Sequence, residues 1–106
     1  MLSRLLALLP VGRYRVEGES MSPGLQPGER VVVNRLAYRL GEPRPGDVVV
    51  LRDPRQRDRL LVKRIEARDD DGRWLVAGDN AAASTDSRAF GPVERALILG
   101  KVWFRY

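Results

Sequence analysis

The order of apolar and polar positions in this sequence predicts short strands separated by turns. β-Branched runs, which are typical of buried strands, occur within residues 30–34 and 47–52. Apolar and polar residues alternate, at least in part, along four further segments: residues 13–17, 59–67, 73–77 and 97–106. No segment has the pattern of a long helix. We therefore expect an all-β fold, a small barrel or folded sheet of about five to seven short strands with long loops.

Turn-forming residues divide these strands. Glycine and proline break the chain at residues 41–46, and an acidic stretch ending in glycine predicts a hairpin turn at residues 68–72. Residues 53–58, which contain a proline, are interpreted as a loop or hairpin end, and residues 36–40 as a helical turn or a continuing strand. Residues 78–92 form a long irregular loop. With neither repeat nor linker, residues 1–106 are predicted to be one domain.

The composition limits the chemistry that this domain can perform. The chain has no cysteine and no histidine, which excludes disulfides, cysteine nucleophiles, histidine-assisted serine catalysis and the common zinc sites. We expect no metal and no cofactor. Catalysis, if present, must use serine, threonine, lysine, tyrosine or carboxylates.

The charge of the chain leaves a second class of function open. A net charge of +5 suits a basic β-barrel that binds nucleic acid without catalysis. However, seventeen of the nineteen basic residues are arginines, and they are scattered among acidic residues. The aromatic residues are also dispersed along the chain and form no evident stacking surface. We therefore expect no nucleic-acid partner.

The first twelve residues contain a short apolar run from Leu5 to Leu9. A helix that spans a bilayer needs about 20 apolar residues, so this segment is too short to be a transmembrane anchor. It also lacks the small-residue cleavage site of a signal peptide. We expect a short segment that lies on the domain or contacts a membrane surface peripherally.

Two residues are candidates for chemistry. Ser20 lies in a turn-rich stretch, residues 18–29, where glycines and prolines constrain the backbone, so it is either a turn residue or a nucleophile. Lys63 falls on the same strand face as Leu61 and Ile65. It is either an edge-strand lysine that extends to water or a buried amine with a lowered pKa that could act as a base. Together they suggest a Ser/Lys dyad. Lys101 is expected to face solvent.

Four segments in order resemble the signal peptidase I family of Ser/Lys serine endopeptidases. Residues 18–29 resemble the nucleophile box, with Ser-Met-Ser-Pro-Gly-Leu starting at Ser20. Residues 45–50 resemble the second box and residues 61–65 the lysine box. Gly-Asp-Asn followed by Ser-Thr-Asp-Ser-Arg, within residues 78–91, resembles the last box.

The resemblance implies a role for each matching residue. Ser20 would be the nucleophile, with its N–H in the oxyanion hole, and Lys63 the general base. Ser84 would orient the lysine amine, and Asp86 and Arg88 would form an ion pair that braces the loop. Gly18 stands where some members have a hydroxyl residue that completes the oxyanion hole, so that donor is absent here.

The resemblance also implies a substrate. The chain has neither the membrane anchor nor the second β-domain of many signal peptidases, and in this it is similar to the nickel-type superoxide dismutase maturation proteases. It would then remove an N-terminal propeptide from a precursor, in the cytoplasm. The alternative is a general type I signal peptidase that is membrane-associated and acts on exported preproteins. A self-cleaving regulatory domain is not expected, because no DNA-binding module fits before the first strand.

Overall fold

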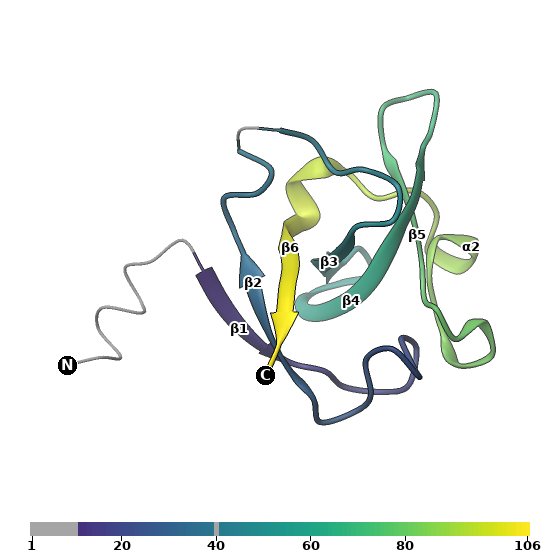
Figure 1. Ribbon diagram of the computed structural model, residues 1–106. Helices are drawn as coiled ribbons and strands as arrows, with labels where there is room; N and C mark the ends of the chain where they lie inside the picture. The colour runs from purple at the N-terminus through teal and green to yellow at the C-terminus, as the bar shows by residue number, and fades with distance from the viewer. Residues whose placement is uncertain (1–10, 40) are drawn as a thin grey trace.

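The computed structural model describes residues 11–39 and 41–106 of the chain, and the segment from Met1 to Pro10 lies outside the described residues. The described chain forms six strands (Figure 1): β1 (Val11–Arg15), β2 (Arg30–Asn34), β3 (Val48–Asp53), β4 (Gln56–Arg68), β5 (Trp74–Ala77) and β6 (Ile98–Arg105). Three short helical turns lie between β5 and β6: η1 (Ala81–Ala83), α2 (Ser87–Phe90) and η2 (Arg95–Leu97). The all-β prediction is confirmed.

The six strands form one antiparallel sheet in the order β1-β2-β6-β3-β4-β5. The consecutive strands β1 and β2, β3 and β4, and β4 and β5 pair with each other, whereas β6 lies between β2 and β3 (Figure 1). Register shifts interrupt the pairs β2–β6, β3–β6 and β4–β5. Such irregularities bend strands and increase their twist, which helps one sheet to fold over on itself.

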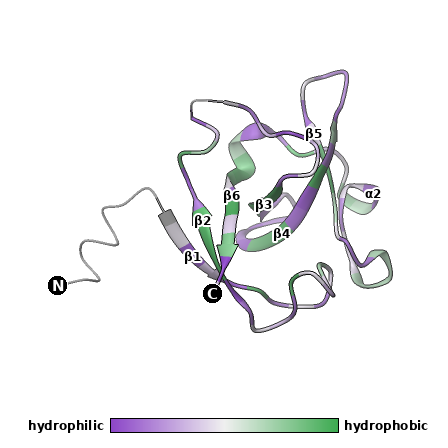
Figure 2. Cartoon of the chain, viewed as in Figure 1, coloured by the Kyte–Doolittle hydropathy of each residue, from purple (hydrophilic) through white to green (hydrophobic). Residues whose placement is uncertain are grey.

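Alternation along the strands creates apolar clusters on both faces of the sheet. Figure 2 shows that hydrophobic residues are concentrated in β2 and β3 and in parts of β6. In β3, Val49 and Leu51 belong to the larger cluster, whereas Val50 between them belongs to the smaller one. The larger cluster contains Tyr38, Val49, Leu51, Ile65, Trp74, Val76, Val93, Leu97 and Ile98. The smaller one contains Val16, Met21, Val31, Val33, Val50 and Val62. The central strands are therefore held from both sides.

The structure corrects two sequence predictions. Of the two alternatives for residues 53–58, the hairpin end is correct and the loop is not: only Pro54 and Arg55 form the turn, and β4 begins at Gln56, earlier than the predicted residue 59, because Asp53 and Gln56 still pair. Residues 78–92 are not wholly irregular, since Asp86 caps a short helix by accepting a hydrogen bond from the N–H of Arg88. The hairpin turn at residues 68–72 and the strand at residues 30–34 are confirmed. Residues 35–39 form turns.

Within residues 11–39 and 41–106, no helix combines the length and the apolar character that crossing a bilayer requires.

Candidate active site

Ser20 lies in the connection between β1 and β2, which is fixed at both ends. Hydrogen bonds from Val16 N to Glu29 O and from Gly28 N to Val16 O, both 2.8 Å, close its base. The next residue, Met21, is only 1% exposed and packs into the smaller apolar cluster. From the other side, Asn80 N donates to Ser20 O at 2.7 Å. Because backbone bonds and a buried neighbour hold it, the serine has a defined position.

Gly18 precedes the serine in the left-handed region, with φ of 72°. Glycine adopts this conformation without the steric cost that a side chain would bring. A Cβ at Gly18 would meet no atom within 4 Å, so space does not exclude a side chain there. The backbone conformation therefore explains why the chain has glycine where a hydroxyl donor could otherwise stand.

Lys63 is buried in the middle of the sheet. It lies on β4 opposite Val49 of β3 and is 3% exposed, and β4 has neighbours on both sides. The alternative of an edge-strand lysine that reaches water is therefore wrong. Burial lowers the pKa of Lys63, although the nearby Asp86 carboxylate opposes this shift. Lys101, in contrast, is exposed as expected and pairs with Asp47 at 3.3 Å.

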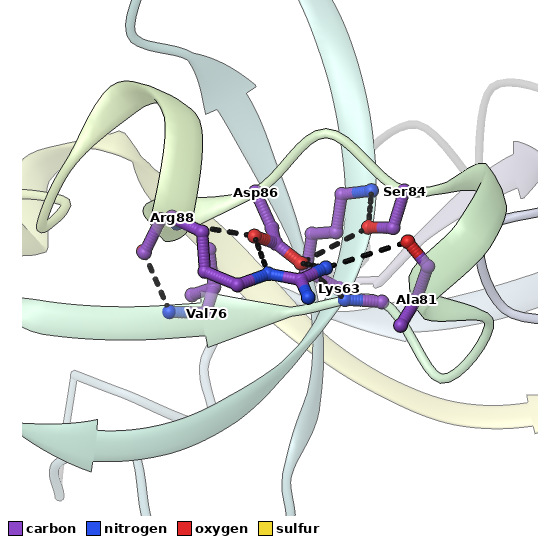
Figure 3. A network of polar contacts seen from close by, with 8 residues as sticks. Lys63, Val76, Ala81, Ser84, Asp86 and Arg88 are labelled. Atoms are coloured by element: carbon purple, nitrogen blue, oxygen red, sulfur yellow. Dashed lines mark hydrogen bonds and ion pairs between the residues drawn. The ribbon is translucent and has the colours of Figure 1, made fainter.

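The lysine amine is held by the loop between β5 and α2. Lys63 Nζ donates to Ser84 Oγ at 2.9 Å, and Ser84 Oγ in turn donates to Asp86 Oδ2 at 3.2 Å (Figure 3). Arg88 binds both carboxylate oxygens of Asp86 through Nε and Nη2, each at 3.0 Å. These are the two contacts that the family resemblance implied, one between Ser84 and the lysine amine and one between Asp86 and Arg88.

Asp86 is the most heavily bonded carboxylate of the site. It is 1% exposed and accepts hydrogen bonds from Arg88, Ser84 and the backbone N–H of Gly78. Burial alone would raise the pKa of this carboxyl, but Arg88 and the two backbone N–H groups outweigh burial and lower it to about 2. Asp86 is consequently ionised throughout the physiological pH range.

We expect Asp86→Asn to remove part of the pH dependence of folding. A carboxyl whose pKa is lower in the folded than in the unfolded state stabilises the fold. This stabilisation is fully present at a pH above the unfolded-state pKa, near 3.9, and is lost as the pH falls towards the folded-state pKa of about 2. The loss in the wild type is about 2 kcal/mol. Urea unfolding at pH 6, 4 and 2.5 measures it. A variant whose free energy of unfolding falls as steeply with acid as the wild type would contradict this role of Asp86.

Ser20 and Lys63 line the same cavity, of about 200 Å³, together with Leu61 and with residues from the last loop. Within the described chain, the hydrogen bond of the amine goes to Ser84 and none joins it to Ser20. Hydrogen bonds of catalytic groups are often long in unliganded enzymes and shorten when the substrate binds. The complete lining is Glu17, Gly18, Glu19, Ser20, Arg55, Arg59, Leu61, Lys63, Ala83 and Thr85.

Sequence reasoning missed the contacts that fix the walls of this cavity. Asp53, 1% exposed, binds Arg55 at the tip of the β3–β4 hairpin, and the Arg55 guanidinium lies 5.4 Å from the ring centre of Phe90. Arg64 forms a bidentate ion pair with Asp79, near the start of the loop at residues 78–92. The Asp-Pro-Arg sequence of the hairpin was a local signal for the first pair. No local signal pointed to the second.

Among the described residues, no group of three or more acidic side chains lies close enough together to hold a metal ion.

Comparison with known proteins gives a consistent answer. A profile described as signal peptidase, peptidase S26, matches residues 1–71 and 66–106. The mitochondrial ATP-independent inner membrane protease subunit 1a of Arabidopsis thaliana is 36% identical over 131 residues, which cover 97% of this chain and 78% of that protein. Signal peptidase IB of Staphylococcus aureus (strain Mu50) is 30% identical over an alignment that covers 88% of this chain and 76% of that protein.

An all-β domain in which a buried lysine and a loop serine face one cavity has the arrangement of a serine endopeptidase that lacks histidine. The chain belongs to the signal peptidase family, peptidase S26, and is a serine-type endopeptidase. This membership decides against the hypothesis of a binding protein without catalytic activity.

Proposed function

We propose that Ser20 is the nucleophile and Lys63 the general base of an endopeptidase that removes an N-terminal signal peptide or propeptide from a precursor protein. The observation that carries the proposal is the environment of Lys63. A lysine that is 3% exposed, shares a cavity with a loop serine and donates to a second serine has the lowered pKa and the fixed position that a base needs.

Ser84 and Asp86 support the base in a specific way. The Ser84 hydroxyl donates its one hydrogen bond to Asp86 Oδ2, so it can only accept a hydrogen bond from Lys63. One N–H of the neutral amine is thereby fixed on Ser84, and the nitrogen lone pair remains free. That lone pair can take the proton of Ser20 as Ser20 Oγ attacks the scissile carbonyl.

The reaction then runs in two halves. In the first, the bond from Ser20 Oγ to the carbonyl carbon forms, the C–N bond breaks, and Lys63 passes its proton to the leaving amine. In the second, Lys63 takes a proton from water, the water oxygen bonds to the acyl carbon, the bond between that carbon and Ser20 Oγ breaks, and Lys63 returns the proton to Ser20 Oγ. The N–H of Ser20 would stabilise the oxyanion, while Gly18 contributes no side-chain donor.

The relatives' names favour a signal peptide as the segment that is removed. One is called a signal peptidase and the other an inner membrane protease. We therefore propose that this chain acts at a membrane surface and cleaves an exported precursor. A second candidate, suggested by the compact core, is maturation of a nickel-type superoxide dismutase in the cytoplasm. It is favoured by the direct hairpin from β4 to β5 at residues 69–73, which leaves no room for a second β-domain there.

Two purified precursors would test these candidates. One is an exported protein with its signal peptide, and the other is a nickel superoxide dismutase with its propeptide. We expect the chain to cleave one of them at a single bond, with the mature N-terminus identified by mass spectrometry. Cleavage by Ser20→Ala at the wild-type rate, or no cleavage of either precursor, would contradict the proposed function.

A further inference from the structure

Each carboxylate buried near the Lys63 amine has its own guanidinium partner. Asp86 is paired with Arg88, and Asp53 with Arg55 at 2.9 Å. Both carboxylates are 1% exposed, so their charges are balanced locally rather than by Lys63. The amine is therefore not required as a cationic partner for either of them.

Arg59 is a further positive charge on the strand that carries Lys63. Alternation along β4 places Arg59, Leu61 and Lys63 on one face, and all three line the cavity that contains Ser20. The side chain is exposed, and the described part of the chain offers it no hydrogen bond and no ion pair. A charge without a partner acts on its surroundings more than a paired one.

We propose that Arg59 is a positioning residue whose positive charge, on the same cavity lining as Lys63, favours the neutral, proton-accepting form of the amine. The proposal rests on the proposed function, because it assigns Arg59 a role in preparing the base. An arginine suits this role, since its guanidinium stays charged at every pH at which the enzyme could work.

The groups around the amine determine how large this effect is. Burial is the main cause of the lowered pKa of Lys63; Asp86 opposes it, Arg59 and Arg55 add to it, and Asp53 opposes it. Because Arg55 is bound to Asp53, much of its effect is cancelled, whereas Arg59 has no ion pair of this kind among the described residues. A like charge that lines the same cavity lowers the pKa of the amine, because it disfavours the charged form.

Glu17 and Glu19 line the same cavity and are both exposed. Burial raises the pKa of Tyr14; Glu17 adds to this rise and Arg59 opposes it, so both charges lie near the Tyr14 hydroxyl. Glu17 therefore partly screens Arg59 in the free enzyme. Glu17→Gln is expected to strengthen the effect of Arg59 on the amine.

The two lysines of this chain, Lys63 and Lys101, make a direct test practicable. In protein labelled with ¹³C-lysine, the Cε signals give one titration curve for each amine, and no substrate is needed. We expect Arg59→Gln to raise the midpoint of Lys63 by about half a pH unit, and Arg59→Glu to raise it further. The shift should shrink at 1 M salt, where charges are screened within about 3 Å. Lys101 should not change.

Matched variants separate charge from other effects. Arg59→Lys keeps the charge and should leave the Lys63 midpoint in place, and so should Arg57→Gln, which removes an exposed arginine of β4 outside the cavity lining. An unchanged midpoint in Arg59→Gln, or an equal shift in Arg57→Gln, would overturn the proposal. The titration does not depend on cleavage, so it stands apart from the Ser20→Ala test of the proposed function. On the acid limb of the pH–rate profile, the cleavage rate of Arg59→Gln should be about threefold lower than that of the wild type.

Discussion

Ser20→Ala and Lys63→Met are each expected to lower kcat/KM by about 10⁴-fold or more, because members of a nucleophile–base pair act as a unit. Lys63→Arg should be equally inactive, since a guanidinium cannot give up its proton at working pH. Cleavage of a precursor that the wild type processes, followed over time by mass spectrometry, measures the loss. The double variant should be no slower than either single one.

Neighbouring residues of the same type provide the controls. Ser22→Ala, two residues after Ser20, should retain activity, because Ser22 is not among the residues that line the cavity. Lys101→Met should also retain it, since it removes only a surface ion pair with Asp47. Full activity in Ser20→Ala would show that another group attacks the substrate.

Loss of activity in Lys63→Met should not be accompanied by loss of stability. Burying an amine disfavours its charged form, so the unfolded state binds more protons between the lowered pKa and about 10.4. The free energy of unfolding of the wild type should therefore rise with pH in that window, and the variant should lack this rise. At pH 7, urea unfolding should find Lys63→Met at least as stable as the wild type.

Gly78→Ala is expected to reduce activity by about 100-fold or more, since misplacing catalytic groups by about 1 Å is enough for such a loss. A Cβ at Gly78 would lie 2.2 Å from Ser84 Oγ, 2.6 Å from Ser84 Cβ and 2.7 Å from Ser20 O. Rotating the Ser84 hydroxyl relieves only the first contact. The other two require the Ser20 loop to move away from the Ser84 loop.

The cost of Gly78→Ala in stability should be about 1–3 kcal/mol, as for other overpacked sites. Measuring kcat/KM and urea unfolding together distinguishes a displaced site from an unfolded protein. Gly24→Ala, in the Ser20 loop, is the control, because its Cβ would make only an ordinary 3.6 Å contact with Met21 O. Wild-type activity in Gly78→Ala would mean that the two loops tolerate separation.

The sequence predicted the strands well where local pattern decides the structure. The valine run of β2 has its predicted bounds, because β-branched residues between turn formers leave few alternatives. The start of β4 was missed, since Pro54 indicates a loop but occupies a two-residue turn here. The position of β6 between β2 and β3 depends on contacts between distant segments, which no local pattern reveals.

The candidate site was predictable to a similar extent. The face that Lys63 shares with Leu61 and Ile65 left a buried amine and an edge-strand lysine open, and the structure decides for burial; the family resemblance indicated Ser84. The hydrogen bond from Gly78 N to Asp86 and the clamp of Arg55 on Phe90 arise only when separate loops meet. The charges around the amine, on which the proposed role of Arg59 rests, likewise come from separate segments and could not be placed from the sequence.

The position of β6 also affects when the protein can become active during its own synthesis. The strands β1 and β2 enclose the Ser20 loop, whereas β3, β4 and β5 carry Lys63 and lead to its supporting loop. In the described chain β6 is the strand that hydrogen-bonds to both groups, and it is made after every residue of the site. Until β6 is added, the sheet therefore lacks the strand that pairs with both β2 and β3, between the Ser20 loop and the strands that hold Lys63. If Ser20 and Lys63 act together as proposed, we expect proteolytic activity to appear only after β6 has joined the two groups of strands.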